Sequence, residues 1–415
     1  MAEPLLDDSR WSALVRRLPS GLDIDRSARE SRAFIRPRGV GSAEELLRLA
    51  LIYGATDLSL RSTASWAETT GLASLSDVAL LDRLRGASDW LAVITSALMT
   101  ASREGLATGG RRVRLVDATN IRGPGRDPAQ WRVHADYDLK RGRFIGFELT
   151  GGSAAERLSR FVPEAGDIFV GDRIYAQSAA ALKGVRDGGA DFLVRRGITS
   201  CRLLHSNGSA FDLPATLTRV AYGKTIEMPV RVPLGKDGTE MRARLIVHHM
   251  PEEYALKART RAKANASWDA QDKRLTTAEY VLLLTSLPKR SFPADTLLAL
   301  YRLRWQIELG FKRLKSLVGL DQLAAKDDRL VRTCLCAKLI VALLSEDLLS
   351  EVLDSPPWEA RALDVHLAPA AHRARRAARR HSRQRHPRTP PRPPISSPSL
   401  QKSRRAIAST KTTDM

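Results

Sequence analysis

The segment from Tyr301 to Lys315, YRLRWQIELGFKRLK, contains the residues whose types and spacing best suit chemistry on charged groups. At about 100° per helical residue, one narrow face collects four polar side chains: Tyr301, Arg304, Glu308 and Lys315. An apolar stripe lies beside this face, formed by Leu300, Leu303, Ile307, Phe311, Leu314 and Val318. Such a helix can bury one side and present Glu308 to a metal ion, with the two basic side chains holding anionic oxygens. Taken alone, an exposed helix with an Arg304–Glu308 ion pair is the simpler interpretation.

Two aspartates strengthen the metal hypothesis, because each follows an apolar run typical of a core strand. Asp117 comes after VRLV, and Asp172 comes after IFVG. Either aspartate by itself can merely cap a turn. Together with Glu308 they form a trio of carboxylates able to hold two divalent cations.

The remaining candidate residues favour structural roles. His248 and His249 are adjacent in an expected strand, so they point to opposite faces and cannot easily share a metal. Trp305 can stack on a displaced base, but a tryptophan beside an apolar stripe more often belongs to a core. The cysteines provide neither a disulfide framework nor a zinc-binding spacing: they are Cys201, Cys334 and Cys336.

Charge is the strongest signal in the composition. The 415 residues contain 67 Lys and Arg against 46 Asp and Glu, a formal charge of +21, which favours a polyanionic partner such as nucleic acid. The N-terminus lacks the features of a secretion signal and no apolar run is long enough to span a membrane, so we expect a cytoplasmic protein. Residues 356–415 are rich in arginine and proline and have no apolar periodicity, which predicts a disordered basic tail.

Periodicity divides the rest of the chain into four parts. We predict a helical N-terminal domain over residues 1–105, the first part of an α/β core over 106–197, a β-rich insertion over 198–290 and a helical completion of the core over 291–355.

Within the N-terminal domain, a helix ending near Gly71 and a second one capped by Ser76 outline a helix-turn-helix. Its second helix carries Asp82, Arg83 and Arg85. DNA binding is the expected role of this domain, although two packed helices of a plain bundle would produce the same pattern and are equally favoured.

The spacing Tyr301-x2-Arg304-x3-Glu308-x6-Lys315 resembles the YREK signature of DDE transposases of the IS-four insertion-sequence family. Asp117 in LVDAT and Asp172 in VGDRIY are similar to the two aspartate motifs of that family, and the resemblance extends over roughly residues 30–350. It implies an α/β fold with a ribonuclease-H-like core (a mixed sheet with helices) interrupted by a β-rich insertion. It also implies that Asp117, Asp172 and Glu308 are catalytic metal ligands.

The same resemblance implies a cofactor, a substrate and a reaction. The cofactor would be two Mg²⁺ ions, with Mn²⁺ as a substitute, and Tyr301, Arg304 and Lys315 would contact DNA near the cleavage site. The expected activity is that of a bacterial, nucleoid-associated transposase that cuts DNA at the terminal inverted repeats of an insertion sequence and joins the 3′-hydroxyl to target DNA, as a homodimer assembled on DNA. Two alternatives stay open: a catalytically inactive DNA-binding remnant, and a metal-dependent endonuclease without strand transfer.

Overall fold

The computed structural model describes residues 7–56, 58–103, 111–123, 131–198, 200–235, 238–264, 277–323, 325 and 327–353. One compact unit spans Met1–Leu349. The basic tail predicted for residues 356–415 lies outside the described residues. None of the described helices is both long and apolar enough to cross a membrane.

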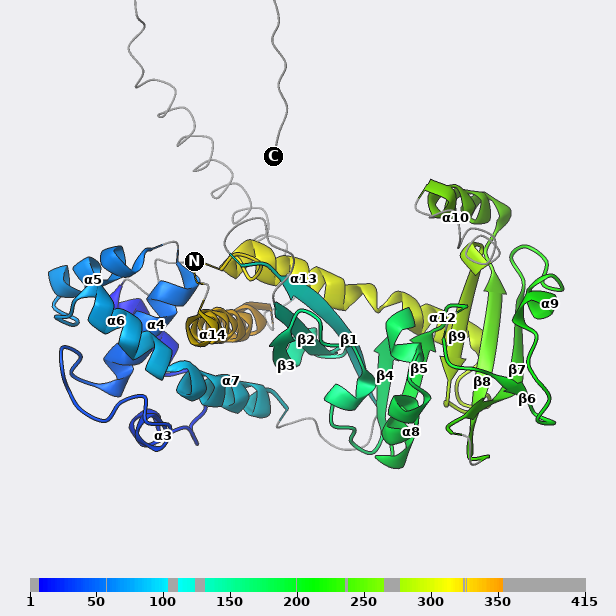
Figure 1. The fold of residues 1–415 in the computed structure, drawn as a ribbon, viewed down its shortest axis with the longest axis horizontal. Coiled ribbons are helices and arrows are strands. Elements are labelled where there is room, and N and C mark those ends of the chain that lie inside the picture. The colour runs from blue at the N-terminus through cyan, green and yellow to red at the C-terminus, as the bar shows by residue number, and fades with distance from the viewer. Residues whose placement is uncertain are drawn as a thin grey trace, which may run out of the picture. The chain divides into compact units, whose positions relative to one another are not determined.

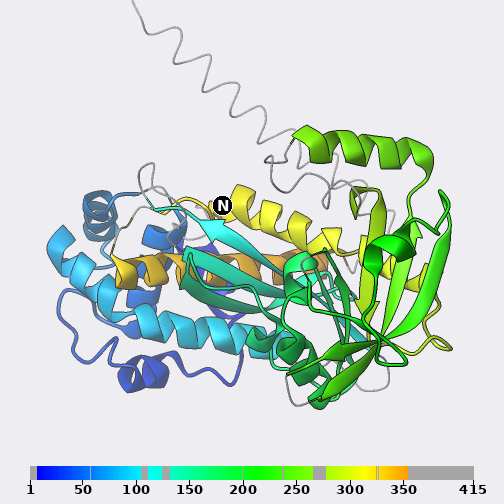
Figure 2. The same cartoon turned by 45° about the vertical axis from the view of Figure 1, so that its right-hand side comes forward.

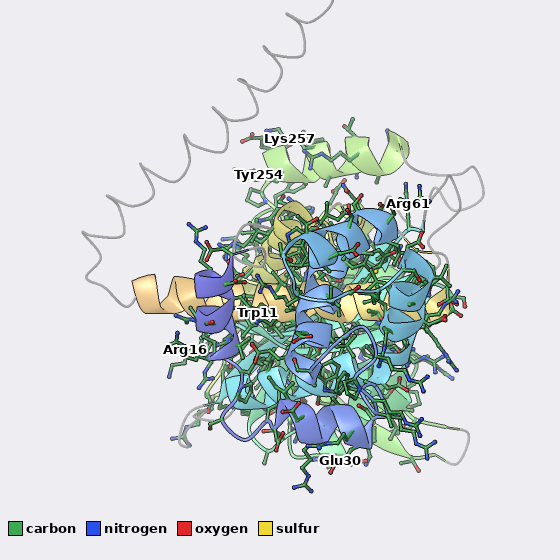
Figure 3. The ribbon with its side chains drawn as sticks, turned by 90° about the vertical axis from the view of Figure 1, so that its left-hand side faces the viewer. Trp11, Arg16, Glu30, Arg61, Tyr254 and Lys257 are labelled. Atoms are coloured by element: carbon green, nitrogen blue, oxygen red, sulfur yellow. The ribbon has the colours of Figure 1, made fainter. Side chains whose placement is uncertain are left out.

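The N-terminal region is helical. Its helices are α2 (Asp8–Val15), α3 (Ile24–Glu30), α4 (Ala43–Ala55), α5 (Leu60–Thr69), α6 (Asp77–Gly86) and α7 (Ser88–Arg103). Ser42 caps α4 by accepting a hydrogen bond from the Glu45 amide at 3.1 Å. Most residues of α4 are buried, whereas Arg16, just after α2, and Glu30, the last residue of α3, project outward (Figure 3).

Helices α5 and α6 have the expected helix-turn-helix outline. Gly71 follows α5 with a φ of +69°, a conformation that favours glycine, and Ser76 caps α6 by accepting from the Ala79 amide.

The arginines of α6 are held within the protein. Arg83 donates to the carbonyl oxygens of Arg36 and Arg38, both at 3.0 Å, and Arg85 pairs with Asp327 at 3.3 Å. These contacts are typical of a packed bundle, because they fasten α6 to its neighbours instead of leaving its cations exposed.

The described residues form a nine-stranded mixed sheet with the order β3-β2-β1-β4-β5-β9-β8-β7-β6 (Figure 1). Strand β1 pairs with β2 antiparallel and with β4 parallel, and β5 continues parallel to β4. The strands are β1 (Arg112–Ile121), β2 (Trp131–Asp138), β3 (Arg143–Gly151), β4 (Asp167–Gly171), β5 (Asp191–Arg195), β6 (Leu204–His205), β7 (Thr225–Pro233), β8 (Glu240–His249) and β9 (Tyr280–Thr285). All nine strands of this sheet lie within the segments predicted as the α/β core, residues 106–197, and the β-rich insertion, residues 198–290.

The segment predicted as a β-rich insertion extends this same sheet. Strand β9 pairs with β5 on one side and with β8 on the other, so Leu284 lies opposite Val194 and Leu245. All three side chains are buried, which explains why residues 198–290 continue the sheet instead of forming a separate one. It also carries the short helix α9 (Leu213–Leu217) and the helix α10 (Glu252–Ala264).

Helices cover both faces of the sheet. On one face lie α12 (Ala294–Arg302), α13 (Trp305–Val318) and α14 (Asp328–Leu353), with α7 beside α14 (Figure 2). On the other face lies α8 (Ala179–Asp187), together with the single turns η1 (Leu158–Arg160) and η2 (Arg173–Ala176). Gly310 lets α13 approach closely, because a methyl group there would lie 2.7 Å from Cζ of Phe144.

Candidate active site

The two aspartates meet at one edge of the sheet because of strand register. In the parallel pair β1 and β4, Leu115 lies opposite Val170. Continuing this register by two residues brings Asp117, within β1, level with Asp172, the first residue after β4. The Asp172 side chain caps η2 by accepting from the Arg173 amide. Two separate strand ends thus supply carboxylates to the same place.

The helix that carries Glu308 differs from the expected one. A single helix was predicted from Tyr301 to Lys315, but α12 ends at Arg302 and α13 begins at Trp305. Bonds of the i to i−3 type join the two helices, including the Arg304 amide to the Tyr301 carbonyl at 3.1 Å. This tight turn changes the rotational phase of the apolar stripe, so Leu303 is exposed although it was expected to be buried.

Arg304 connects Glu308 to the sheet. Its guanidinium lies 2.6 Å from Oε1 of Glu308 and 3.5 Å from Oδ2 of Asp117. The Glu308 carboxylate therefore faces the strand end, as the metal hypothesis requires, while the i,i+4 ion pair of the simpler interpretation is also present. The structure combines both features in one contact network.

The other two members of the predicted set behave differently. Tyr301 lies beside Arg304, whose Cζ is 6.0 Å from the ring centroid, and the pKa of its hydroxyl is raised by burial and by the Asp172 charge. Lys315 is half-buried farther along α13 and forms no ion pair among the described residues. The structure thus gathers Asp117, Asp172, Tyr301, Arg304 and Glu308 but not Lys315.

Burial makes the charged form of Asp117 unfavourable. Burial, with smaller contributions from the neighbouring carboxylates of Glu156 and Asp172, raises the pKa of Asp117 to about 6. A hydrogen bond from the Ala118 amide at 2.9 Å and the charge of Arg304 offset only part of this shift. Removing a proton from Asp117 therefore adds an unfavourable charge, which a bound cation would relieve.

Sequence reasoning missed two residues of this cluster. Glu156 is an inward-facing carboxylate 3.5 Å from Arg132, with a pKa raised by burial and by Asp172. Tyr175 is buried, its hydroxyl has no partner among the described residues, and its pKa is raised by burial and by the charges of the cluster. Neither residue belongs to a spacing pattern, so only the fold reveals them.

A cavity of about 250 Å³ lies beside the cluster. Its lining combines cations and rings: Arg195, His248, Tyr301, Arg302, Arg304 and Trp305. The prediction that Trp305 belongs to a core was wrong, since 48% of the residue is exposed and the Lys312 ammonium lies 4.5 Å from its ring centroid. The tight turn before α13 places Trp305 outside the buried stripe.

The two adjacent histidines contact different partners, as predicted. His248 bonds the Thr225 hydroxyl at 2.9 Å, whereas His249 is buried and bonds the Val220 carbonyl at 2.6 Å.

The cluster offers suitable donors for a hard metal ion, but they are not gathered around one point. Across the described part of the chain, no three His, Cys, Asp or Glu side chains are close enough together to hold a metal. The Arg304 guanidinium occupies the position between Asp117 and Glu308. The donors are carboxylate oxygens, which Mg²⁺ prefers, and burial raises the pKa of Asp117, so a bound cation would stabilise its charged form. The residue types fit a metal, provided that Arg304 moves aside.

Comparison with known proteins identifies the class of protein to which this site belongs. Residues 108–344, from just before β1 to within α14, match the family described as "Transposase DDE domain". The chain is 40% identical over 359 residues to the putative transposase InsL of insertion sequence element IS186A from Escherichia coli (strain K12), covering 84% of this chain and 96% of that protein.

Two further matches are also transposases by name. The transposase of element IS421 from Escherichia coli is also 40% identical, with the same coverage of both chains. A solved structure, the piggyBac transposase synaptic complex with hairpin DNA, aligns with a TM-score of 0.41 at 11% identity, over 84% of this chain and 75% of that one. The family match and the identity to the curated relatives show that this chain belongs to the DDE transposases of the IS-four insertion-sequence family.

Proposed function

We propose that this transposase cleaves DNA at the ends of an insertion sequence and joins the released 3′-hydroxyl to target DNA by two-metal phosphoryl transfer. The observation that carries the proposal is the convergence of Asp117 and Asp172 at one sheet edge, with Glu308 linked to them through Arg304. Burial there disfavours the charged form of Asp117, which a bound cation would stabilise.

The strand arrangement supports a ribonuclease-H-like core within the larger sheet. In the order β3-β2-β1-β4-β5 the first three strands are antiparallel, and β4 and β5 run parallel to β1. This core would carry Asp117 and Asp172, and residues 198–290 would be its insertion. The insertion returns the chain to α12 and α13, which deliver Glu308.

Asp117, Asp172 and Glu308 would hold the metal ions. Two bound Mg²⁺ ions, or Mn²⁺ in their place, would supply Lewis acidity for the attacking and leaving oxygens of the phosphodiester. Arg304 now bridges Asp117 and Glu308, so it must release at least one of them when the site is loaded. Its guanidinium is then free to hold a phosphate oxygen of the scissile strand.

The remaining polar residues would orient DNA. Tyr301 and Arg304 line the cavity beside the carboxylates, and Lys315 lies on the same helix as Glu308 without a competing ion pair in the described chain. Phosphate contacts of this kind position the strand without selecting its sequence. The protein would act as a homodimer on DNA within the bacterial nucleoid, and sedimentation of the protein–DNA complex tests its stoichiometry.

Incubation of the purified full-length chain with labelled element ends, target DNA and Mg²⁺ tests the proposal. We expect both cleaved ends and joined products. Cleaved ends without joining would indicate an endonuclease, and binding without cleavage would indicate a catalytically inactive remnant. A reaction that proceeds equally well in excess chelator would reject the metal-dependent mechanism.

A further inference from the structure

A second cavity, of about 460 Å³, opens on the sheet face opposite α13. Arg195 and Arg196 follow each other at the end of β5, so their side chains point to opposite faces. Arg195 lines the cavity beside the carboxylates, and Arg196 lines this second cavity. The other polar and aromatic side chains around it are Ser200, Arg202, Phe211 and Asp212.

Arg196 is buried without a counter-charge. Only 5% of the residue is exposed, and its Nη2 donates one hydrogen bond, to the Cys201 carbonyl at 3.2 Å. Its Nε and Nη1 have no hydrogen-bond partner, and no carboxylate among the described residues pairs with it. Burial accordingly lowers the pKa of this guanidinium.

An unpaired buried guanidinium is costly, because desolvation is not offset by hydrogen bonds or opposite charge. The other arginines buried near the sheet avoid this cost: Arg114, for example, donates to Asp136 and Asp167. Arg196 therefore lacks the kind of carboxylate partner that Arg114 has. A ligand in the adjoining cavity can supply one.

The surroundings indicate that the missing partner is an anion. Arg202 lines the same cavity, is exposed, and forms no ion pair with a described carboxylate. The acidic residue of the lining, Asp212, is exposed, and its Oδ1 already accepts from the Ala215 amide at 3.0 Å. The planar guanidinium, whose Nε and Nη1 have no hydrogen-bond partner, matches the oxygens of a phosphate group.

We propose that Arg196 and Arg202 form a binding site for a phosphate group in this cavity. The phosphate can belong to a DNA backbone or to a free phosphate-bearing molecule. The DNA source rests on the proposed function and is favoured by position, because Gly197 lies against the Arg173 side chain and Arg173 is 4.0 Å from Asp172. The site would then hold the strand on the far side of the carboxylates from α13.

Thermal unfolding in inorganic phosphate tests the site without any cleavage assay. At ten times the dissociation constant we expect a rise of about 2 °C over chloride of equal ionic strength. Arg196→Met should abolish this rise, whereas the control Arg290→Met, which removes an exposed arginine, should retain it. In chloride, Arg196→Met should unfold at or above the wild-type temperature, because it removes an uncompensated buried charge.

A DNA-binding titration distinguishes the two sources. If the phosphate belongs to DNA, Arg196→Met should reduce the slope of log K against log salt by about one unit, and Arg196→Lys should restore part of it. A phosphate effect with unchanged DNA binding would assign the site to a free phosphate-bearing molecule. No phosphate effect in the wild type, or an Arg196→Met protein that unfolds several degrees early in chloride, would overturn the proposal. Because neither readout involves cleavage, an inactive transposase would leave this test intact.

Discussion

Strand β1 carries two charge clusters only three residues apart, and they are built in opposite ways. At Arg114, which is 1% exposed, one guanidinium donates to the carboxylates of Asp136 and Asp167, and Arg112 donates to Asp167 at 2.7 Å. At Asp117, the Arg304 guanidinium lies 3.5 Å from the carboxylate and is shared with Glu308. The neighbouring carboxylates of Glu156 and Asp172 lie 3.5 Å from Arg132 and 4.0 Å from Arg173.

The pKa values record this difference. Hydrogen bonds and charge from Arg112 and Arg114 outweigh burial and hold the pKa of Asp167 below its usual range. Burial and neighbouring carboxylates raise the pKa of Asp117 to about 6. The first cluster is complete within the protein and stabilises the sheet. In the second cluster, burial outweighs the attraction of Arg304, so the charged form of Asp117 is disfavoured.

The largest expected effect is on cleavage. Asp117→Asn, Asp172→Asn and Glu308→Gln should each reduce the single-turnover rate by at least about 100-fold, equivalent to roughly 3 kcal/mol. DNA binding should persist, because the basic surface is unchanged. The control Asp187→Asn alters an exposed carboxylate on α8 and should cleave normally. A rate within about threefold of wild type would exclude the substituted residue as a metal ligand.

The Arg114 cluster should instead control stability. Arg114→Met leaves Asp136 buried beside an apolar side chain, so we expect the free energy of unfolding to fall by about 3–5 kcal/mol. Arg26→Met, which removes an exposed ion pair with Glu30, should have a much smaller effect, because solvent screens that pair. Urea denaturation measures both. Equal losses in the two variants would show that the clusters do not differ as argued.

The two aspartates should respond to pH with opposite signs. The folded-state pKa of Asp117 lies above the usual 3.8, so the contribution of Asp117 to the free energy of unfolding falls as pH rises from about 4 to 6. In chelator at pH 7, Asp117→Asn should therefore gain up to about 3 kcal/mol over wild type, and nothing at pH 4.

The pKa of Asp167 is lowered, so its stabilisation is present above pH 4 and is lost on acidification. Asp167→Asn should accordingly be destabilised at pH 7 and approach wild type at low pH. Unfolding curves collected between pH 3 and 7 compare the two variants directly. If the stability difference from wild type changed with pH in the same direction for both variants, the two clusters would not differ electrostatically as argued.

The smallest expected effects concern Arg304 and Lys315. If they orient the scissile strand, Arg304→Ala and Lys315→Ala should slow cleavage of saturating, pre-bound DNA by about 10-fold or more, roughly 1.4 kcal/mol. Overall affinity should change less, because many other cations hold DNA. An exposed helical ion pair would cost only about 0.3–0.5 kcal/mol of stability and leave cleavage unchanged. Wild-type rates in both variants would reject the positioning role.

Much of this architecture is local and was therefore predictable. Alternating hydrophobicity located the strands that contain Asp117 and precede Asp172, and the capping residue Ser76 located the start of α6. The helical period correctly predicted that Ile307 is buried, and its side chain packs in the core. Each of these signals depends on residues a few positions apart, where backbone geometry repeats.

The sequence by itself thus determined the family signature, the mixed α/β class and the acidic residues worth testing. Only the tertiary structure decided that Glu156 and Tyr175 join those residues and that a tight turn exposes Trp305. It also decided that Arg196 is buried without a carboxylate partner in the described part of the chain. The physical reason is that burial and charge balance are properties of the assembled sheet. They arise from strand register and from helices that return after long connections, and no short spacing in the chain encodes them.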